Sequence, residues 1–241
     1  MEEKEKLKNE QDLFMMGDIH GSFEEMTWTL TQRHKIRDAN IILLGDFGVG
    51  FNKPAYYDNL FNKVICPKLE ENNLSLFVIR GNHDDPEYFN GEHDYPRIKF
   101  LKDHELITLS EKIIYPIGGA ISHDKAWRIE YNKKMESYGS SKRVWWPNEG
   151  VIKEYKNLPG KVDIIVSHTS PLSFPPVIVR GSSETDEDYL GMLEERKYLD
   201  YVFRNVRCKY WIGAHWHTSL TFSLEDVLYK CLDINELYKF N

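Results

Sequence analysis

The sequence predicts an α/β protein built from two sheets packed face to face, with helices on the outside. Two observations indicate this fold class. Near-continuous apolar runs of strand length alternate with amphipathic helical segments, and polar clusters rich in Asp and His follow several of these runs. Apolar strands of this kind are typical of parallel strands that are covered on both faces. The length of 241 residues fits one domain, with or without an elaborate insert.

The first half of the chain predicts the succession strand, helix, strand, helix, strand. Ser22 is a candidate N-cap with Glu25 at the capping-box position, and Pro54 suits the first turn of the second helix. That helix also has apolar residues at helical spacing, namely Leu60, Phe61, Val64, Ile65 and Leu69. The predicted elements are a strand over 13–16, a helix over 22–34, a strand over 40–44, a helix over 54–72 and a strand over 74–79.

The second half is less regular, and an insert over about 119–150 is polar and aromatic with no clean period. Residues 169–188 combine a proline-rich run with an acidic run and predict a loop. We predict a single domain over 13–241, preceded by a charged lead-in over 1–12. The remaining predicted elements are a hairpin over 106–109 and 112–117, a short helix over 149–155, a strand over 162–166, a helix over 189–203, a strand over 210–212 and antiparallel strands over 219–222 and 226–232.

Composition and charge argue against several classes of protein. No apolar run approaches the ~20 residues that span a bilayer, and no apolar segment typical of a signal peptide follows Met1, so no membrane role is expected. The cysteines Cys66, Cys208 and Cys231 are widely spaced and odd in number, which indicates a reducing compartment and a cytoplasmic protein. The formal net charge of -7 argues against broad electrostatic binding of nucleic acid, though not against a local basic groove.

Five short polar clusters carry the chemistry that the sequence predicts. Four of them directly follow an apolar run, and ligands of open α/β sheets bind beyond the carboxyl ends of the strands. The clusters offer carboxylate, amide and imidazole groups, a mixed oxygen and nitrogen set that suits Mn, Fe, Zn, Co or Ni better than Ca or Mg. They are Asp18-Ile19-His20, Gly45-Asp46, Gly81-Asn82-His83-Asp84, Ser167-His168 and Gly213-Ala214-His215-Trp216-His217.

These five motifs, in this order, make the chain from Leu13 to about Phe222 resemble the calcineurin-like metallophosphoesterase superfamily. The resemblance implies a four-layer α/β/β/α sandwich of two mixed sheets. It also implies two divalent metal ions, with Mn as the first choice and Fe, Zn, Co or Ni as alternatives. A hydroxide that bridges the metals would attack phosphorus in line, and His83 would stabilise the transition state or protonate the leaving oxygen. By this resemblance, one metal is held by Asp18, His20 and His217, Asp46 bridges both metals, and the second metal is held by Asn82, His168 and His215.

The chain departs from the protein-phosphatase members of this superfamily after Gly45-Asp46. Their Val-Asp-Arg-Gly segment is replaced by Phe47-Gly48-Val49-Gly50-Phe51. The arginine that helps to clamp phosphate is therefore missing, as is the aspartate that pairs with the catalytic histidine. Asp84 and Asp85 are the adjacent candidates to orient His83, and we take His83 and Asp84 as the candidate catalytic pair.

The insert offers further candidate contacts to the substrate. Arg128 or Arg143 would replace the missing phosphate clamp, and surface salt bridges are the alternative use of these two residues. Trp145 and Trp146 would form a wall that stacks a base or an apolar leaving group, or would pack the insert onto the core.

The predicted function is metal-dependent hydrolysis of phosphoester bonds in a phosphomonoester or a small phosphodiester, such as a nucleotide. A nuclease or a Ser/Thr phosphoprotein phosphatase is the alternative among enzymes, and a non-catalytic binding scaffold is the alternative outside them. The acidic charge, the compact domain and the absent protein-phosphatase segment favour a phosphorylated small molecule over nucleic acid. The sequence indicates no obligate protein partner.

Overall fold

The structure is a computed structural model that describes residues 11–177 and 185–240. The first of its two sheets contains β1 (Asp12–Met16), β2 (Ala39–Leu43), β3 (Leu74–Val78), β4 (Ile98–Phe100) and β11 (Leu237–Phe240). Their order across the sheet is β11-β1-β2-β3-β4. Strands β1 to β4 are parallel, and β11 runs antiparallel to β1 at the edge.

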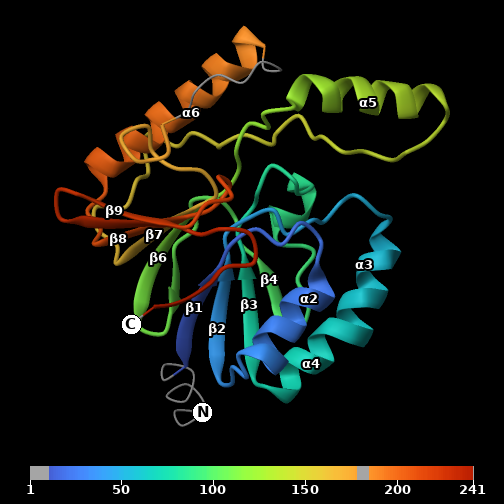
Figure 1. Ribbon diagram of the computed structural model, residues 1–241, viewed down its shortest axis with the longest axis horizontal. Coiled ribbons are helices and arrows are strands. Elements are labelled where there is room, and N and C mark those ends of the chain that lie inside the picture. Colours follow the sequence, from blue (N-terminus) through green and yellow to red (C-terminus); the bar gives the residue numbers. More distant parts are fainter. Residues whose placement is uncertain (1–10, 178–184, 241) are drawn as a thin grey trace.

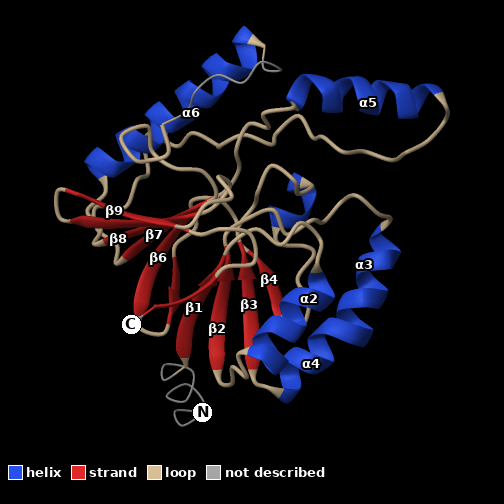
Figure 2. Cartoon of the chain, viewed as in Figure 1, coloured by secondary structure: helices blue, strands red, loops and turns tan. Residues whose placement is uncertain are grey.

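The second sheet contains β5 (Ile107–Leu109), β6 (Lys112–Ile117), β7 (Ile164–Ser167), β8 (Tyr210–Gly213), β9 (Leu220–Leu224) and β10 (Val227–Cys231). Their order is β5-β6-β7-β8-β10-β9. The four inner strands are parallel, and the edge strands β5 and β9 are antiparallel to their neighbours. Figure 2 shows the two sheets as separate groups of strands. Both sheets are mixed, because each contains parallel and antiparallel pairs.

Helices cover the outer face of each sheet (Figure 1). The first sheet packs against α2 (Phe23–Trp28), α3 (Pro54–Leu60) and α4 (Cys66–Glu71). A π-helical turn (Thr29–Arg33) follows α2, and another (Phe61–Ile65) joins α3 to α4. The second sheet packs against α6 (Asp186–Asn205), which contributes Tyr198, Leu199 and Val202 to a buried cluster with Trp211. The predicted four-layer α/β/β/α sandwich of two mixed sheets is therefore confirmed.

Apolar side chains from both sheets fill the space between them. Met15 and Ile42 of the first sheet pack in one buried cluster with Ile164, Val166 and Ile212 of the second. Complete burial of aliphatic side chains of this size contributes about 1.5–3 kcal/mol each. The intervening positions of the same strands face the helices, so β2 is buried at every residue. Burial on both faces is the physical reason for apolar runs without polar alternation.

Several predicted elements differ from the structure. The insert contains a long helix, α5 (Lys125–Ser137), which the sequence did not predict because none of its residues is buried. Residues 149–155 are irregular rather than helical. Ser22 makes no side-chain capping hydrogen bond, so the predicted capping box is wrong. β4 and β11 are additional strands, whereas the predicted hairpin is confirmed by the antiparallel pair β5 and β6.

The two ends of the insert are hydrogen-bonded to α6, whereas its middle part extends away from the sheets. Glu195 of α6 accepts hydrogen bonds from the backbone N–H groups of Ile121 (3.0 Å) and Val151 (3.4 Å), which lie at the two ends of the insert. Beyond these anchors, α5 and the segment that returns from it extend away from both sheets (Figure 1). Residues 1–10 of the predicted lead-in and residues 178–184 of the predicted loop lie outside the described residues.

The fold places the polar clusters at one end of the molecule. They follow the carboxyl ends of β1, β2, β3, β7 and β8, and these ends meet where the two sheets converge. Within the described part of the chain, no helix has both the length and the apolar character that crossing a bilayer requires.

Candidate metal centre

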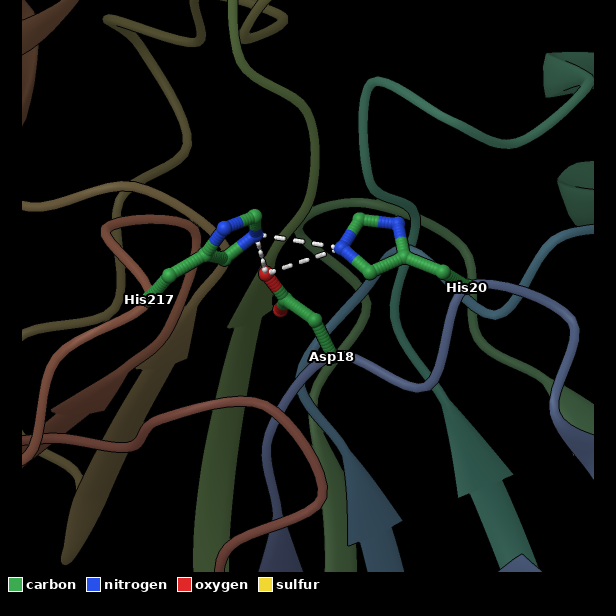
Figure 3. A group of neighbouring side chains, drawn as sticks. All are labelled: Asp18, His20 and His217. Carbon is green, nitrogen blue, oxygen red and sulfur yellow. Dashed lines mark hydrogen bonds and ion pairs between the residues drawn. The ribbon is translucent and has the colours of Figure 1, made fainter. Parts of the chain in front are cut away.

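Three side chains from two distant parts of the chain point toward one another at this end (Figure 3). Asp18 and His20 follow β1, and His217 follows β8. The Nε2 atoms of His20 and His217 are 3.0 Å apart. Asp18 Oδ2 lies 3.1 Å from His217 Nε2 and 3.9 Å from His20 Nε2. One cation between these three atoms would be bound by one oxygen and two nitrogens, a ligand set that transition metals accept.

The bonding of Asp18 fits such a cation. Its Oδ2 atom is buried and makes no hydrogen bond of normal geometry, although the His217 ring is close. A buried carboxylate oxygen without a hydrogen bond is costly unless a cation compensates it. The donor set therefore fits a divalent metal at this position.

A second group of ligand atoms surrounds His168. Its Nδ1 atom donates a hydrogen bond to the carbonyl of Leu44 at 2.6 Å, which leaves Nε2 as the acceptor of the neutral ring. That Nε2 atom faces two further acceptors, Asn82 Oδ1 at 2.9 Å and Asp46 Oδ1 at 3.2 Å. Acceptor atoms gather around one point when a proton or a metal ion lies between them. The geometry therefore fits a second cation site next to the first.

Asp46 lies between these two groups. Its Oδ2 atom is 3.7 Å from His20 Nδ1, and its Oδ1 atom accepts a hydrogen bond from the His83 backbone N–H at 2.8 Å. The ligand atoms form three overlapping groups, each within 4.8 Å: Asp18 with His20 and His217, His20 with Asp46 and His83, and Asp18 with Asp46 and His168. His215 is not in these groups, but its ring lies edge-on to that of His168 with a centroid distance of 4.9 Å.

The charged groups of the cluster shift one another's pKa values. Burial opposes the charged form of His168, but Asp46 and Asp18 outweigh burial and raise its pKa to about 9. Burial also opposes the charge of Asp46, yet His168 and His83 hold its pKa well below the usual range. Burial and the neighbouring His168 lower the pKa of His215. A bound metal would take the place of the proton on His168.

The backbone is constrained at the candidate ligands. His20, Asp46, His215 and His217 all have positive φ values, between 46° and 70°. Residues other than glycine rarely adopt this region, and such conformations persist at sites where the surrounding structure enforces them. Gly81 is required for a different reason, because a Cβ at this position would lie 2.2 Å from Asp46 Oδ1.

His83 and Arg128 face each other at the edge of the cluster. Arg128 comes from α5, and its Nη2 atom is 3.0 Å from His83 Nε2. Asp124 and the Val144 carbonyl hold the other guanidinium nitrogens of Arg128. Burial lowers the pKa of His83, with Asp46 opposing and Arg128 adding to the effect. Burial therefore favours the neutral form of the ring, whose Nε2 atom accepts a hydrogen bond from the guanidinium.

A cavity of about 370 Å³ opens onto these groups, and we call it the reaction cavity. The sequence-predicted residues that line it are Asp46, Asn82, His83, Arg128, His215 and His217. The other three candidates for substrate binding lie elsewhere. Arg143 and Trp146 line a neighbouring cavity, and Trp145 lines a third cavity beside α5, which Arg143 lines as well. Trp146 is buried and meets Phe51 edge-on, which is a packing role.

Asp84 has a different place from the one expected. It is completely buried, and its carboxylate accepts hydrogen bonds from the backbone N–H groups of Gly81 (2.8 Å), Phe47 (3.2 Å) and Gly48 (2.7 Å). Burial raises its pKa to about 6, and the charge of Asp46 adds to this. Among the described hydrogen bonds and ion pairs, none joins Asp84 to the His83 ring. This corrects the expectation that Asp84 orients His83, because the carboxylate instead joins the loops after β2 and β3.

Sequence reasoning missed two residues that are hydrogen-bonded in series to the Asn82 side chain. Asn82 Nδ2 donates a hydrogen bond to Ser122 Oγ at 2.9 Å, and Ser122 Oγ donates to Glu149 Oε2 at 2.7 Å. Glu149 Oε1 also accepts from the Ser122 backbone N–H at 3.2 Å. All three side chains are buried. No local pattern in the sequence marks Ser122 or Glu149, because they reach Asn82 only through the folding of the insert.

A comparison with known protein families agrees with this geometry. The sequence matches the family described as calcineurin-like phosphoesterase over residues 13–219. No curated protein sequence matches the chain. Among solved structures, the phosphopantetheinyl hydrolase of Mycobacterium tuberculosis is similar at 12% identity and a TM-score of 0.45, covering 95% of this chain and 91% of its own.

A 5′-nucleotidase candidate from Staphylococcus aureus is similar at 12% identity and a TM-score of 0.38. The alignment covers 93% of this chain and 48% of the other, so the chain spans about half the length of that protein. These two likenesses are distant, and the assignment rests on the family match over most of the chain. That match identifies the chain as a member of the calcineurin-like phosphoesterase family and as a metal-dependent phosphoesterase.

Proposed function

We propose that this protein uses two divalent metal ions, with Mn²⁺ as the first choice, to hydrolyse phosphoesters of small molecules. The observation that carries the proposal is the convergence of Asp18, His20, Asp46, His168 and His217 into overlapping groups of ligand atoms within 4.8 Å. In our assignment, one metal is held by Asp18, His20 and His217, Asp46 is shared, and the second metal is held by Asn82, His168 and His215.

When bound, two divalent cations supply positive charge to the phosphate oxygens and lower the pKa of water. Only Asp18 and Asp46 bring negative charge among the proposed ligands, so the loaded site keeps a net positive charge. Such a site attracts a phosphate dianion.

We assign two further roles to residues of the chain itself. Arg128 would bind a nonbridging phosphate oxygen through the guanidinium that now contacts His83, in place of the arginine missing after Asp46. The neutral His83 ring would gain proton affinity beside a phosphate dianion, and it would then deliver the proton to the leaving oxygen. Asp124 would act indirectly by holding Arg128.

The size of the reaction cavity supports a small phosphomonoester or a small phosphodiester. A volume of about 370 Å³ accommodates a phosphoryl group and part of its alcohol. The net charge of -7 disfavours a nucleic acid as the general substrate.

The test is a paired rate assay after chelation and reloading with Mn²⁺. It compares para-nitrophenyl phosphate with bis(para-nitrophenyl) phosphate, and Asp46→Asn serves as the impaired variant. The exposed residue Asp226 gives a matched control, Asp226→Asn. We expect hydrolysis of at least one ester by wild type and the control, and its loss in Asp46→Asn. A protein that holds two metals and cleaves neither ester would instead support a binding scaffold.

A further inference from the structure

A second cavity, of about 530 Å³, lies beside the reaction cavity, and the reaction proposed above does not use it. We call it the insert cavity, because residues 140–143 and Trp146 of the insert line it. Its volume is within the range of roughly 300–1,000 Å³ that is typical of small-molecule sites. The lining residues used below are the aromatic residues Phe51 and Trp146 and the basic residues Lys53, Lys142 and Arg143.

Phe51 lies between the two cavities. Its ring centroid is 6.4 Å from that of His83 in the reaction cavity and 5.1 Å from that of Trp146 in the insert cavity. Gly50 permits this packing, because a Cβ there would lie 2.3 Å from Asp85 Cβ and 2.8 Å from the Trp146 ring. A substrate with its phosphate beside His83 would therefore extend past Phe51 into the insert cavity.

Hydrogen bonds within the insert hold its returning segment beside α5. Arg128 Nη1 donates to the Val144 carbonyl at 3.0 Å. Asn132 donates to the Trp145 carbonyl at 2.8 Å and accepts from the Val144 N–H at 2.9 Å. The returning segment is thus held in register along α5. Arg128 lines the reaction cavity, while Arg143 lies between the insert cavity and the third cavity beside α5 and lines both.

The charges of the insert cavity favour an anion. None of the ion pairs between described residues uses Lys53, Lys142 or Arg143. Two carboxylates also line the cavity, and one of them, Asp85, accepts a hydrogen bond from the Glu87 N–H at 3.1 Å. Burial raises the pKa of Asp85, whereas its hydrogen bond from the Glu87 N–H and the nearby Arg143 oppose this rise. The three basic residues of the lining outnumber its two carboxylates, Asp85 and Glu87, so the lining carries a net positive charge that favours a phosphate group.

On the basis of the function proposed above, we propose that the insert cavity binds the leaving group of the substrate. This leaving group would carry an aromatic ring and a second phosphate, as in a nucleoside bisphosphate. Phe51 would stack on the ring, and Lys53, Lys142 and Arg143 would bind the second phosphate. In the reaction, the oxygen of water forms a bond to phosphorus in the reaction cavity, the ester P–O bond breaks with its electron pair on the leaving oxygen, and one proton of the water is transferred to that oxygen. The products are inorganic phosphate and the alcohol that still carries the second phosphate.

The test compares three substrates of the Mn²⁺-loaded protein: adenosine 3′,5′-bisphosphate, adenosine 5′-monophosphate and para-nitrophenyl phosphate. We expect the bisphosphate to have the lowest KM. Replacing Lys142 and Arg143 together by alanine should raise the KM for the bisphosphate by about tenfold to a hundredfold, as loss of charged hydrogen bonds does. The same variant should leave kcat/KM for para-nitrophenyl phosphate within about twofold, because that ester carries no second phosphate.

Lys68→Ala is the matched control, since Lys68 is an exposed residue of α4 that lines neither cavity. Phe51→Leu should raise the KM for all three substrates, because each leaving group carries an aromatic ring on which Phe51 would stack. An unchanged KM for the bisphosphate in the double variant would overturn the inference, as would equal losses on all three substrates in that variant. Tighter competition by a single-stranded oligonucleotide than by the bisphosphate would also overturn it. Hydrolysis of para-nitrophenyl phosphate in these cases would leave the proposed function intact.

Discussion

Replacing Ser122 by alanine tests how Asn82 is oriented toward the second proposed metal. Ser122 Oγ accepts from Asn82 Nδ2 at 2.9 Å and donates to Glu149 Oε2 at 2.7 Å. The first hydrogen bond fixes which end of the carboxamide faces His168. Without the hydroxyl, the amide group can turn and present its NH₂ end, which cannot bind a cation.

The expected size of the effect follows from these two contacts. Ser122→Ala removes both side-chain hydrogen bonds and leaves the buried Glu149 carboxylate with the backbone N–H of residue 122 at 3.2 Å. An unsatisfied buried polar group costs about 1–3 kcal/mol. Loss of a residue that orients a metal ligand typically weakens metal affinity about 10–100-fold. We therefore expect one of two metals to bind at least about tenfold more weakly.

The assay is calorimetric titration of the metal-free protein with Mn²⁺, combined with metal analysis after dialysis. Ser110→Ala is a matched control, because Ser110 Oγ also accepts from an asparagine, Asn40, at 3.3 Å. Glu149→Gln keeps an acceptor oxygen for Ser122 and should lose less affinity than Ser122→Ala. If Ser122→Ala binds both metals as tightly as wild type, the proposed orientation of Asn82 is wrong.

Three more predictions concern catalysis and stability. His83→Ala should keep both metals and lose about 10²–10⁴-fold in kcat; loss of metal in the same variant would make His83 a ligand. Arg128→Ala should raise the KM for phosphomonoesters about tenfold. Arg128→Lys should recover only part of the wild-type affinity, because a lysine cannot bind phosphate in a bidentate way. Equal KM values for wild type and both variants would exclude Arg128 as the phosphate-binding residue. Burial raises the pKa of Glu195 from 4.5 to about 7, so the folded state holds a proton more tightly than the unfolded chain. The charge of Glu149 adds to this rise in pKa, and His168 opposes it. The free energy of unfolding therefore falls by roughly 3 kcal/mol as the pH rises from 4.5 to 7. Glu195→Gln should lack this decrease in urea unfolding at pH 5 and pH 7.5, and an unchanged pH dependence would contradict it.

The sequence was sufficient to predict the core of the fold and the place where the candidate metal ligands gather. Buried strands such as β2 have apolar residues at every position, and Asp46 follows β2 almost directly. Both signals are local, so they can be read without knowing how the chain folds. β11 gave a weaker signal because it is short and pairs with β1, which lies more than 200 residues earlier.

The insert could not be predicted in the same way. A helix with no buried residue has no apolar period, so α5 left no pattern in the sequence. The contact of Arg128 with His83 depends on where this helix lies, and Asp84 was assigned a role from adjacency alone. Adjacent residues in a loop point in different directions, and Asp84 turns toward the backbone of the neighbouring loop.

The shallow attachment of the insert has a consequence for how this enzyme could change over evolutionary time. Because α5 buries none of its residues, substitutions on its exposed surface and along the returning segment remove little of the packing that stabilises the sheets. The proposed metal ligands come from loops at the sheet ends, outside the insert. Apart from Arg128 and the buried Trp146, residues 125–146 can therefore vary, so that the preferred ester changes while the residues proposed to cleave it are inherited intact.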